Sequence, residues 1–246
     1  MKLSTKLLTL ALVAVPVIPA VAYAQTAATA PTTVAKYTFD KGASSGRIAE
    51  NSGRGVSLKI RTVDGGAVKF PAASGGGKYI GFPAHCVPSA TKPCPRALLE
   101  GADDPDLDPV RRQFRYGATI YVQKWQVHGS ANVMQKGVVS TESQWKLQIG
   151  EVTGRAQCVV VGRGSTQTYI ARAGVTVADG KWHRVMCLRT ATVLTVFVDG
   201  RNRGHVALPS TLDISNNLPL RIGGPNFSAG SDMYNGFLDD AYVALG

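Results

Sequence analysis

Runs of apolar, β-forming residues alternate with turn residues most clearly between positions 175 and 208. Residues 181–189 are rich in Trp, Val, Met, Cys and Leu, and residues 193–198 are mostly β-branched or aromatic. Asp-Gly pairs stand at 179–180, before the first run, and at 199–200, after the second. Strand-like runs bounded by Asp-Gly at this spacing predict an antiparallel hairpin that leads into a third strand.

Similar short strand patterns recur along the rest of the chain. In residues 144–150, Trp145, Leu147 and Ile149 alternate with Gln144, Lys146 and Gln148, which predicts a strand with one buried and one wet face. Other runs of β-forming residues, separated by Gly- and Pro-containing turns, cover 34–39, 56–61, 67–70, 97–100, 114–124, 156–161, 167–172 and 235–245. No stretch of ten residues after position 24 shows helical periodicity, so the pattern predicts an all-β sandwich or barrel.

The first 24 residues have the pattern of a secretory signal peptide. Lys2 and Lys6 form a charged start, residues 7–18 are apolar, and Ala-Tyr-Ala at 22–24 is a small-x-small cleavage site. We therefore predict cleavage after Ala24 and a secreted, extracellular protein. The apolar run is short and interrupted by proline, and no later segment is apolar enough, so no membrane span is expected in the mature chain.

Export places the four cysteines in an oxidising compartment, where three disulfide pairings are possible. We favour Cys86–Cys94, which closes a Pro-rich loop, and Cys158–Cys187, which joins two predicted strands. A zinc site is the alternative. It fits the spacing poorly, because the chain has no Cys-x-x-Cys and only His85 lies next to a cysteine.

The chain is basic, with a formal net charge of +11 that falls to +9 once Lys2 and Lys6 leave with the signal peptide. This charge favours a glycan or anionic extracellular polymer as partner, and the alternative is an ordinary solvated surface. The basic residues form no run, and the densest group is Arg111, Arg112 and Arg115. Because the interleaved aromatic residues of a nucleic-acid module are absent, no specific nucleic-acid partner is expected.

Three stretches resemble laminin-G-like domains, which are jelly rolls of the concanavalin A-like type. They are DGKWHRVMCLR with its partner strand ending in Val-Asp-Gly, the opening YTFDKGASSGRIAENSG, and the closing NGFLDDAYVAL. The resemblance implies a two-sheet antiparallel jelly-roll sandwich over residues 34–246, with residues 84–96 as a disulfide-closed insertion. Residues 25–33, rich in Ala, Thr and Pro, would be a short disordered lead.

The same resemblance implies a calcium site, because many sandwiches of this type bind calcium through carboxylate and carbonyl oxygens. An aspartate in the N-terminal loop and another in the closing strand correspond to Asp40 and Asp239, and Asn51 is a further oxygen donor. Lys41 departs from the family pattern, which often has Glu there. The alternative is that both aspartates only cap turns.

Catalysis is not expected from the residues present. Glycanases of this architecture place carboxylates as Glu-x-Asp-x-x-Glu on one strand, and no glutamate here has a second carboxylate two or four residues away on the same strand face. Residues 42–46, Gly-Ala-Ser-Ser-Gly, match Gly-x-Ser-x-Gly in letters, but no helix is predicted after them, so no nucleophile elbow is expected. His183 belongs to the hairpin pattern and is interpreted as structural. The sequence therefore predicts no catalytic residues.

Glycan binding needs exposed aromatic side chains beside polar groups. Trp125 follows a predicted strand and is the candidate ligand contact, whereas core packing is favoured for Trp145 and Trp182, which lie within strand patterns. In residues 182–188 one alternating set is apolar apart from Arg184, and the other carries Val185 and Cys187, so the inner face of that strand stays open. The interpretation that fits best is a non-catalytic recognition or adhesion module. A structural cell-surface protein without a small ligand is second, and a polysaccharide-acting enzyme third.

Overall fold

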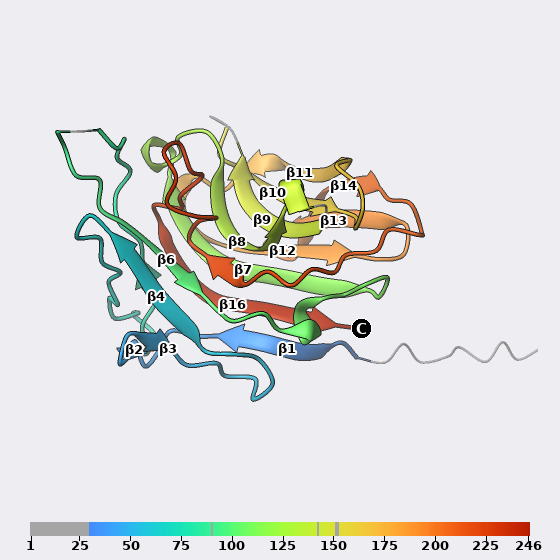
Figure 1. Cartoon of the computed structure of the whole chain (residues 1–246), viewed down its shortest axis with the longest axis horizontal. Coiled ribbons are helices and arrows are strands. Elements are labelled where there is room, and N and C mark those ends of the chain that lie inside the picture. The colour runs from blue at the N-terminus through green and yellow to red at the C-terminus, as the bar shows by residue number, and fades with distance from the viewer. Residues whose placement is uncertain (1–29, 90, 142, 151–152) are drawn as a thin grey trace, which may run out of the picture.

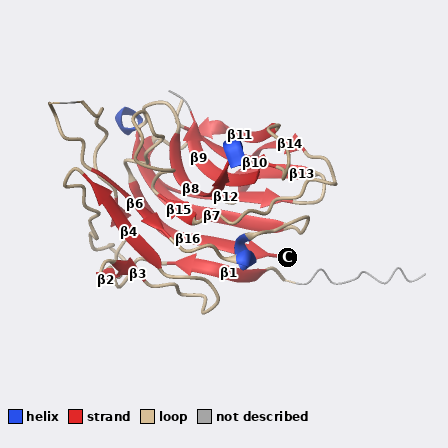
Figure 2. Ribbon diagram, in the orientation of Figure 1, coloured by secondary structure: helices blue, strands red, loops and turns tan. Residues whose placement is uncertain are grey.

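A computed structural model describes residues 30–246, apart from residues 90, 142, 151 and 152. Its strands form two stacked antiparallel sheets, one of seven strands (sheet A) and one of nine (sheet B), among the described residues (Figure 1). Within the described residues, helix is confined to short 3₁₀ turns (Figure 2): η1 (Pro105–Leu107), η2 (Lys124–Gln126) and η3 (Val139–Thr141). The predicted jelly-roll sandwich is therefore confirmed. The predicted signal peptide, residues 1–24, lies outside the described residues.

Sheet A joins the two ends of the described chain to the central hairpin. Its strands follow in the spatial order β1 (Thr32–Tyr37), β16 (Phe237–Leu245), β7 (Phe114–Gln123), β12 (Asp179–Arg189), β13 (Val193–Val198) and β14 (Arg201–Ala207), with β5 (Ile80–Gly81) also pairing with β16. Along each strand alternate residues point inward, so Tyr116, Ala118 and Ile120 of β7 are buried between the sheets.

Sheet B covers the inner face of sheet A. Its strands follow in the order β11 (Thr168–Thr176), β10 (Arg155–Val161), β9 (Ser143–Gly150), β8 (Ala131–Val138), β15 (Leu220–Ile222), β6 (Arg96–Glu100), β4 (Leu58–Val63), β3 (Arg47–Ile48) and β2 (Ala43–Ser44). Trp145 of β9 is fully buried and packs against Phe114 and Tyr116 of β7, with ring centroids 6.1 and 4.9 Å away. These rings fill the middle of the core.

The first and last strands are neighbours, as expected: β1, blue in Figure 1, lies beside β16, red, with Tyr37 paired to Ala241 and Thr32 to Leu245. Two expectations need correction. The disordered lead does not extend to residue 33, because Thr32 and Thr33 already pair in the sheet. Residues 67–70 form no strand, since their pairing there is a single bridge from Lys69 to Gly81.

The predicted hairpin of β12 and β13 is present, with Val185 paired to Val198 and Arg189 to Leu194. Its second Asp-Gly pair makes the turn into β14: Asp199 and Gly200 have φ values of 52° and 76°, a backbone that Asp-Gly tolerates well. The first Asp-Gly pair starts β12 instead, at a register shift between Asp179 and Trp182. This bulge sets the direction in which the following side chains point.

Both predicted disulfides are confirmed. Cys158 of β10 bonds to Cys187 of β12, so this bridge links sheet B to sheet A through the core. Cys86 bonds to Cys94 and closes the predicted loop just before β6. Because Cys187 points inward, Val185 and Arg189 also face the core, which settles the orientation that the sequence left open.

The acidic loop at residues 101–109 anchors a fully buried lysine. Lys136 of β8 places its ammonium 2.9 Å from an Asp103 carboxylate oxygen and 2.8 Å from one of Asp108, and it also donates to the Asn216 carbonyl. Asp104 caps η1 by accepting from the Asp106 amide at 3.0 Å. These aspartates therefore hold the loop against the end of the sandwich.

His183 links the two Asp-Gly positions. Its Nδ1 lies 2.8 Å from an Asp199 carboxylate oxygen, and its Nε2 lies 2.9 Å from one of Asp179. Burial alone would lower the pKa of His183, but these hydrogen bonds outweigh it and raise the pKa above its ordinary value. Burial alone would raise the pKa of Asp179 and of Asp199, but their hydrogen bonds with His183 outweigh it and lower both pKa values.

We expect this cluster to make stability depend on pH. A raised histidine pKa stabilises the fold fully below about pH 6.5, and the contribution is lost as pH rises through the folded-state pKa. The lowered aspartate pKa values contribute above about pH 4 and are lost on further acidification. The Tm difference between the wild type and His183→Gln should therefore be largest between about pH 4 and pH 6.5 and should shrink at alkaline pH. Equal differences at acidic and alkaline pH would contradict this. His205→Gln, at an exposed position of β14, is the control.

Replacing Lys136 with methionine should destabilise the protein by about 3 kcal/mol, because it leaves two carboxylates and a carbonyl without their cation. We take the low end of the usual range because Asp103 keeps part of its contact with water. Urea denaturation measures the change, with Lys124→Met at an exposed position as control. If both variants unfold at the same urea concentration, Lys136 does not anchor the acidic loop.

Candidate functional site

The predicted metal residues Asp40 and Asp239 lie within electrostatic reach of each other. Asp40 follows β1 in a turn, and Asp239 lies in β16. Burial raises the pKa of Asp239 to about 6, and the negative charges of Asp240 and Asp40 act in the same direction, while Lys36 opposes them. The structure thus brings together the two carboxylates that the family resemblance paired.

Asn51 stands on the other side of the same turn, but its oxygen is already used. Asn51 Oδ1 accepts from the Thr38 amide at 3.1 Å and from the Thr38 hydroxyl at 3.4 Å, which holds this loop to the end of β1. Asp40 Oδ1 rests against Gly77, where a Cβ would lie only 2.0 Å away. Among the described residues, no group of three or more His, Cys, Asp or Glu side chains could hold a metal ion. A calcium site here would therefore need carbonyl oxygens beside the two carboxylates, and it stays a prediction.

The three tryptophans have different environments. Trp125, on η2, is 62% exposed, and its indole N–H donates to Gln123 Oε1. Trp145 is buried as expected, and its N–H donates to the Leu107 carbonyl at 3.0 Å. The expectation for Trp182 was wrong: it is 41% exposed on the outer face of sheet A, because the alternating set that contains Cys187 faces the core.

Trp182 belongs to a group of four aromatic side chains, which we call the aromatic row. Tyr79 precedes β5, Phe237 lies on β16, Tyr121 on β7 and Trp182 on β12. Ring centroids are 5.1 Å apart for Tyr79 and Trp182, 5.2 Å for Tyr79 and Phe237, and 5.6 Å for Tyr121 with each of Trp182 and Phe237. Phe237 pairs with Tyr121, and Tyr121 with Trp182, so the row crosses the outer face of sheet A.

A shallow depression adjoins the aromatic row on the same face. Thr119 of β7, two residues from Tyr121 on the same face, pairs with both Asp239 and Arg184. The depression has a volume of about 260 Å³, and its lining includes Lys36, Thr119, Arg184, Asp240 and Tyr242. Basic groups, an aromatic hydroxyl and one carboxylate thus stand next to exposed rings.

The outer face of sheet B carries a different set of groups, which we call the amide face. It consists of five amide side chains on three adjacent strands that are at most 6% exposed: Asn132, Gln135, Gln144, Gln148 and Gln157. Sequence alternation correctly predicted the outward side of β9. It did not predict that this side would be shielded from water, because neighbouring strands supply the shielding.

The amides bond to one another in two groups. Asn132 Nδ2 donates to Gln135 Oε1 at 2.6 Å, and Gln148 Nε2 donates to Gln157 Oε1 at 2.7 Å. Asn132 Oδ1 and Gln148 Oε1 are buried, and neither has a hydrogen-bond partner among the described residues. These two residues are direct neighbours in the pairing of β8 with β9. Two unpaired acceptors therefore stand side by side, although such groups normally find a donor.

Lys146 and Asp232 lie on the same side of sheet B. Lys146 precedes Gln148 by two residues on β9, and Asp232 accepts the Asn132 main-chain N–H at its carbonyl, 2.9 Å away. Burial lowers the pKa of Lys146, and Asp232 opposes this shift. Burial raises the pKa of Asp232, and Lys146 opposes it in turn. A partly buried pair of opposite charges thus lies within the amide face, between Gln144 and Gln148.

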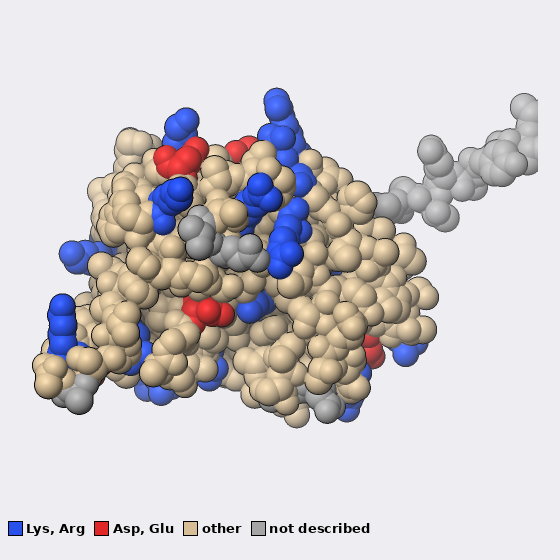
Figure 3. Space-filling view, turned by 90° about the horizontal axis from the view of Figure 1, so that it is seen from above, with Lys and Arg blue, Asp and Glu red and all other residues tan. Residues whose placement is uncertain are grey.

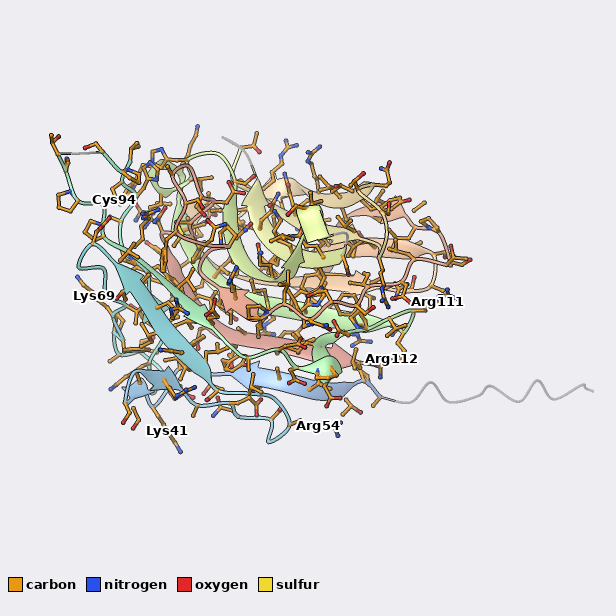
Figure 4. All side chains as sticks on the ribbon, in the orientation of Figure 1. Lys41, Arg54, Lys69, Cys94, Arg111 and Arg112 are labelled. Carbon is orange, nitrogen blue, oxygen red and sulfur yellow. A yellow bond between two sulfur atoms is a disulfide. The ribbon has the colours of Figure 1, made fainter. Side chains whose placement is uncertain are left out.

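Basic residues are spread over the surface. Seen from above, Lys and Arg side chains form several separate groups with few acidic neighbours (Figure 3). Arg111 and Arg112, from the densest basic group in the sequence, lie at one end of the molecule, and Lys41 and Lys69 lie at the other (Figure 4). None of the helices in the described part of the chain is long and apolar enough to cross a membrane.

Several solved structures resemble this fold. Domain 4 of AbnA, a GH43 extracellular arabinanase from Geobacillus stearothermophilus solved with arabinotriose, superimposes with a TM-score of 0.64 at 14% identity, over 88% of this chain and 93% of that chain. The binding domain of Paraclostridial Mosquitocidal Protein 1 superimposes with a TM-score of 0.62 at 13% identity, over 87% of this chain and 48% of that chain. The binding domain of Botulinum Neurotoxin DC in complex with SialylT superimposes with a TM-score of 0.62 at 9% identity, over 87% of this chain and 48% of that chain. The chain spans about half the length of the two toxin chains, and at these identities the likeness establishes the fold alone.

Sequence comparison is informative at the family level only. No curated protein matches the chain. Residues 114–244, more than half of the 246, match the family described as the concanavalin A-like lectin/glucanases superfamily. This segment includes the hairpin that carried the resemblance, both strands of the core disulfide, and the strands of the amide face. The protein therefore belongs to the concanavalin A-like lectin/glucanases superfamily.

Proposed function

We propose that this protein is a secreted, non-catalytic module that binds a glycan on the amide face. The observation that carries the proposal is the pair of buried, unpaired acceptors, Asn132 Oδ1 and Gln148 Oε1. A buried acceptor without a donor costs roughly 1–3 kcal/mol. Sugar hydroxyls are donors, and two on neighbouring ring carbons could reach two acceptors on adjacent strands. Binding, once these amides turn toward the ligand, would thus satisfy two acceptors that have no partner among the described residues.

The chemistry of this face supports binding rather than reaction. Glycosidases use two carboxyl groups, one to protonate the leaving oxygen and one to act as base or nucleophile. The amide face instead presents neutral groups that can only exchange hydrogen bonds. Asp232 is partnered in charge by Lys146 and not by a second carboxylate. A polysaccharide-acting enzyme remains the third reading.

Secretion is supported by the two disulfides, which persist in oxidising compartments, together with the signal-peptide pattern of residues 1–24. The structural relatives agree with a recognition role, since those named above include a domain bound to arabinotriose and toxin binding domains. A structural cell-surface protein without a small ligand is the second reading, and ligand screening separates the two.

We further propose that Asp40 and Asp239 bind calcium together with carbonyl oxygens of their loops, with Asn51 holding the loop in place. The specific support is electrostatic: two carboxylates lie close enough for one to raise the pKa of the other. A divalent cation would relieve this repulsion, and calcium prefers such hard oxygen donors.

Replacing Gln148 with leucine should reduce glycan affinity about tenfold, because one hydrogen bond to the ligand is lost. An array of neutral and acidic oligosaccharides, probed with and without a calcium chelator, identifies the ligand, and calorimetry then compares the variants. Gln113→Leu, at an exposed position outside the amide face, is the control and should bind normally. Equal affinity in wild type and Gln148→Leu would refute the role of the amide face. An array without any bound glycan would favour the structural reading.

Added calcium should raise the Tm of the wild type and leave that of Asp239→Asn unchanged, because bound ligand stabilises only the folded state. The rise should be smaller at pH 5 than at pH 7, since the pKa of Asp239 is about 6 and protons compete with the cation. Without calcium, Asp239→Asn should melt higher than the wild type at neutral pH, because a raised carboxyl pKa penalises the folded state above it. No Tm change in the wild type would end the calcium proposal.

A further inference from the structure

The aromatic row is an exposed apolar surface on the outer face of sheet A, on the opposite side of the sandwich from the amide face. Tyr79, Tyr121 and Phe237 are partly buried and support the indole of Trp182, which is 41% exposed. Their edge-on and tilted contacts fix the orientation of that ring. A rigid, accessible indole offers a flat surface to the C–H face of a sugar ring, at a small cost in side-chain entropy.

A positive group stands next to this indole. Arg184 follows Trp182 by two residues on β12, so its side chain leaves the same face of the sheet about 7 Å away. The Arg184 main chain donates to Asp199 at 2.9 Å, but its guanidinium forms no ion pair with any described residue. Lys36 also lines the depression, and its contact with Asp240 is loose, at 3.9 Å.

The same depression is closed by Tyr242, and a second arginine lies beyond it. The charges of Arg115 and Arg184 both reach the Tyr242 hydroxyl, where they oppose the effect of burial on its pKa. Gly117, between Tyr242 and Met186 in the sheet, contributes no side chain, and a Cβ there would meet the Val185 carbonyl at 2.4 Å. Two cationic side chains and hydroxyl groups, with the single carboxylate of Asp240 among them, therefore line a hollow beside the exposed indole.

We propose that the outer face of sheet A is a second binding site, specific for an anionic glycan. A sugar ring stacks on Trp182, and its carboxylate or sulfate group lies over Arg184 and Lys36. Same-face side chains on a strand stand about 7 Å apart, a gap that the long side chain of Arg184 can span toward a charged substituent of a ring stacked on Trp182. This inference stands on its own residues and holds even if the amide face binds no glycan.

Two sites on opposite faces give the module a further property. A ligand on sheet A and a ligand on sheet B would point away from each other, so one molecule could connect two polymer chains. Linked sites of this kind gain effective affinity on repetitive polymers. Cross-linking of an anionic glycan to the amide-face ligand is thus an expected consequence, and loss of either site abolishes it.

The test uses dextran sulfate and polygalacturonate as anionic probes, and unmodified dextran as the neutral counterpart. We expect the wild type to bind both anionic probes and not dextran, with affinity falling as salt rises. Trp182→Ala, which changes no charge, and Arg184→Gln should each weaken binding at least tenfold. Arg111→Gln, which removes a distant exposed charge, should bind like the wild type. Thermal melting confirms that each variant is folded, and Arg184→Gln keeps the test decisive if Trp182→Ala is unstable.

Four results would overturn this site. The first is unchanged binding by folded Trp182→Ala. The second is an equal loss in Arg184→Gln and Arg111→Gln, which would indicate non-specific charge attraction. The third is equal binding of dextran. The fourth is self-association of the wild type that Trp182→Ala abolishes, without binding to either anionic probe, which would make the row a dimer contact. Gln148→Leu should keep its affinity for the anionic probes, so a failure of the amide face is distinguishable from a failure here.

Discussion

The bond between Cys158 and Cys187 is the constraint on which both candidate faces depend. It crosses the core from β10 to β12, so it fixes the two sheets relative to each other and sets which side of each strand points inward. Gln157, next to Cys158, must then point outward into the amide face. On β12 the inward Cys187 leaves Arg184 and Trp182 on the outer face of sheet A. Such a cross-link also removes conformational freedom from the unfolded chain.

Buried cations close one end of the sandwich. Lys136 is held by the aspartates of the acidic loop, and Arg189 donates to the carbonyls of Val110, Arg112 and Leu212. Each charge is buried with several oxygen partners, which offsets much of the cost of removing it from water. The acidic loop is therefore part of the framework, and this explains why its four aspartates are absent from the candidate sites.

The two outer faces present opposite chemistry on one scaffold. The amide face has neutral, shielded groups with two unpaired acceptors, which suit hydroxyl donors. The face of sheet A has the exposed indole of Trp182 beside Arg184, which forms no ion pair within the described part of the chain, and these groups suit a flat apolar ring with an anionic substituent. Because each strand alternates inward and outward side chains, one core can support two independent surfaces. The concanavalin A-like fold positions these groups, and their identities determine what can bind.

The sequence by itself determined most of the longer strands, the turns and both disulfides, because these follow from local rules: Asp-Gly turn geometry, two-residue alternation, and the placing of two cysteines on predicted strands and two in one short loop. Through the family resemblance it also suggested that Asp40 and Asp239 meet. Only the tertiary structure decided which side of β12 faces out, since residues 182–188 carry apolar side chains on both sides, and so it alone revealed the exposure of Trp182. It alone brought Asn132 beside Gln148 and Tyr79 beside Trp182, because such meetings depend on strand register between segments far apart in the chain.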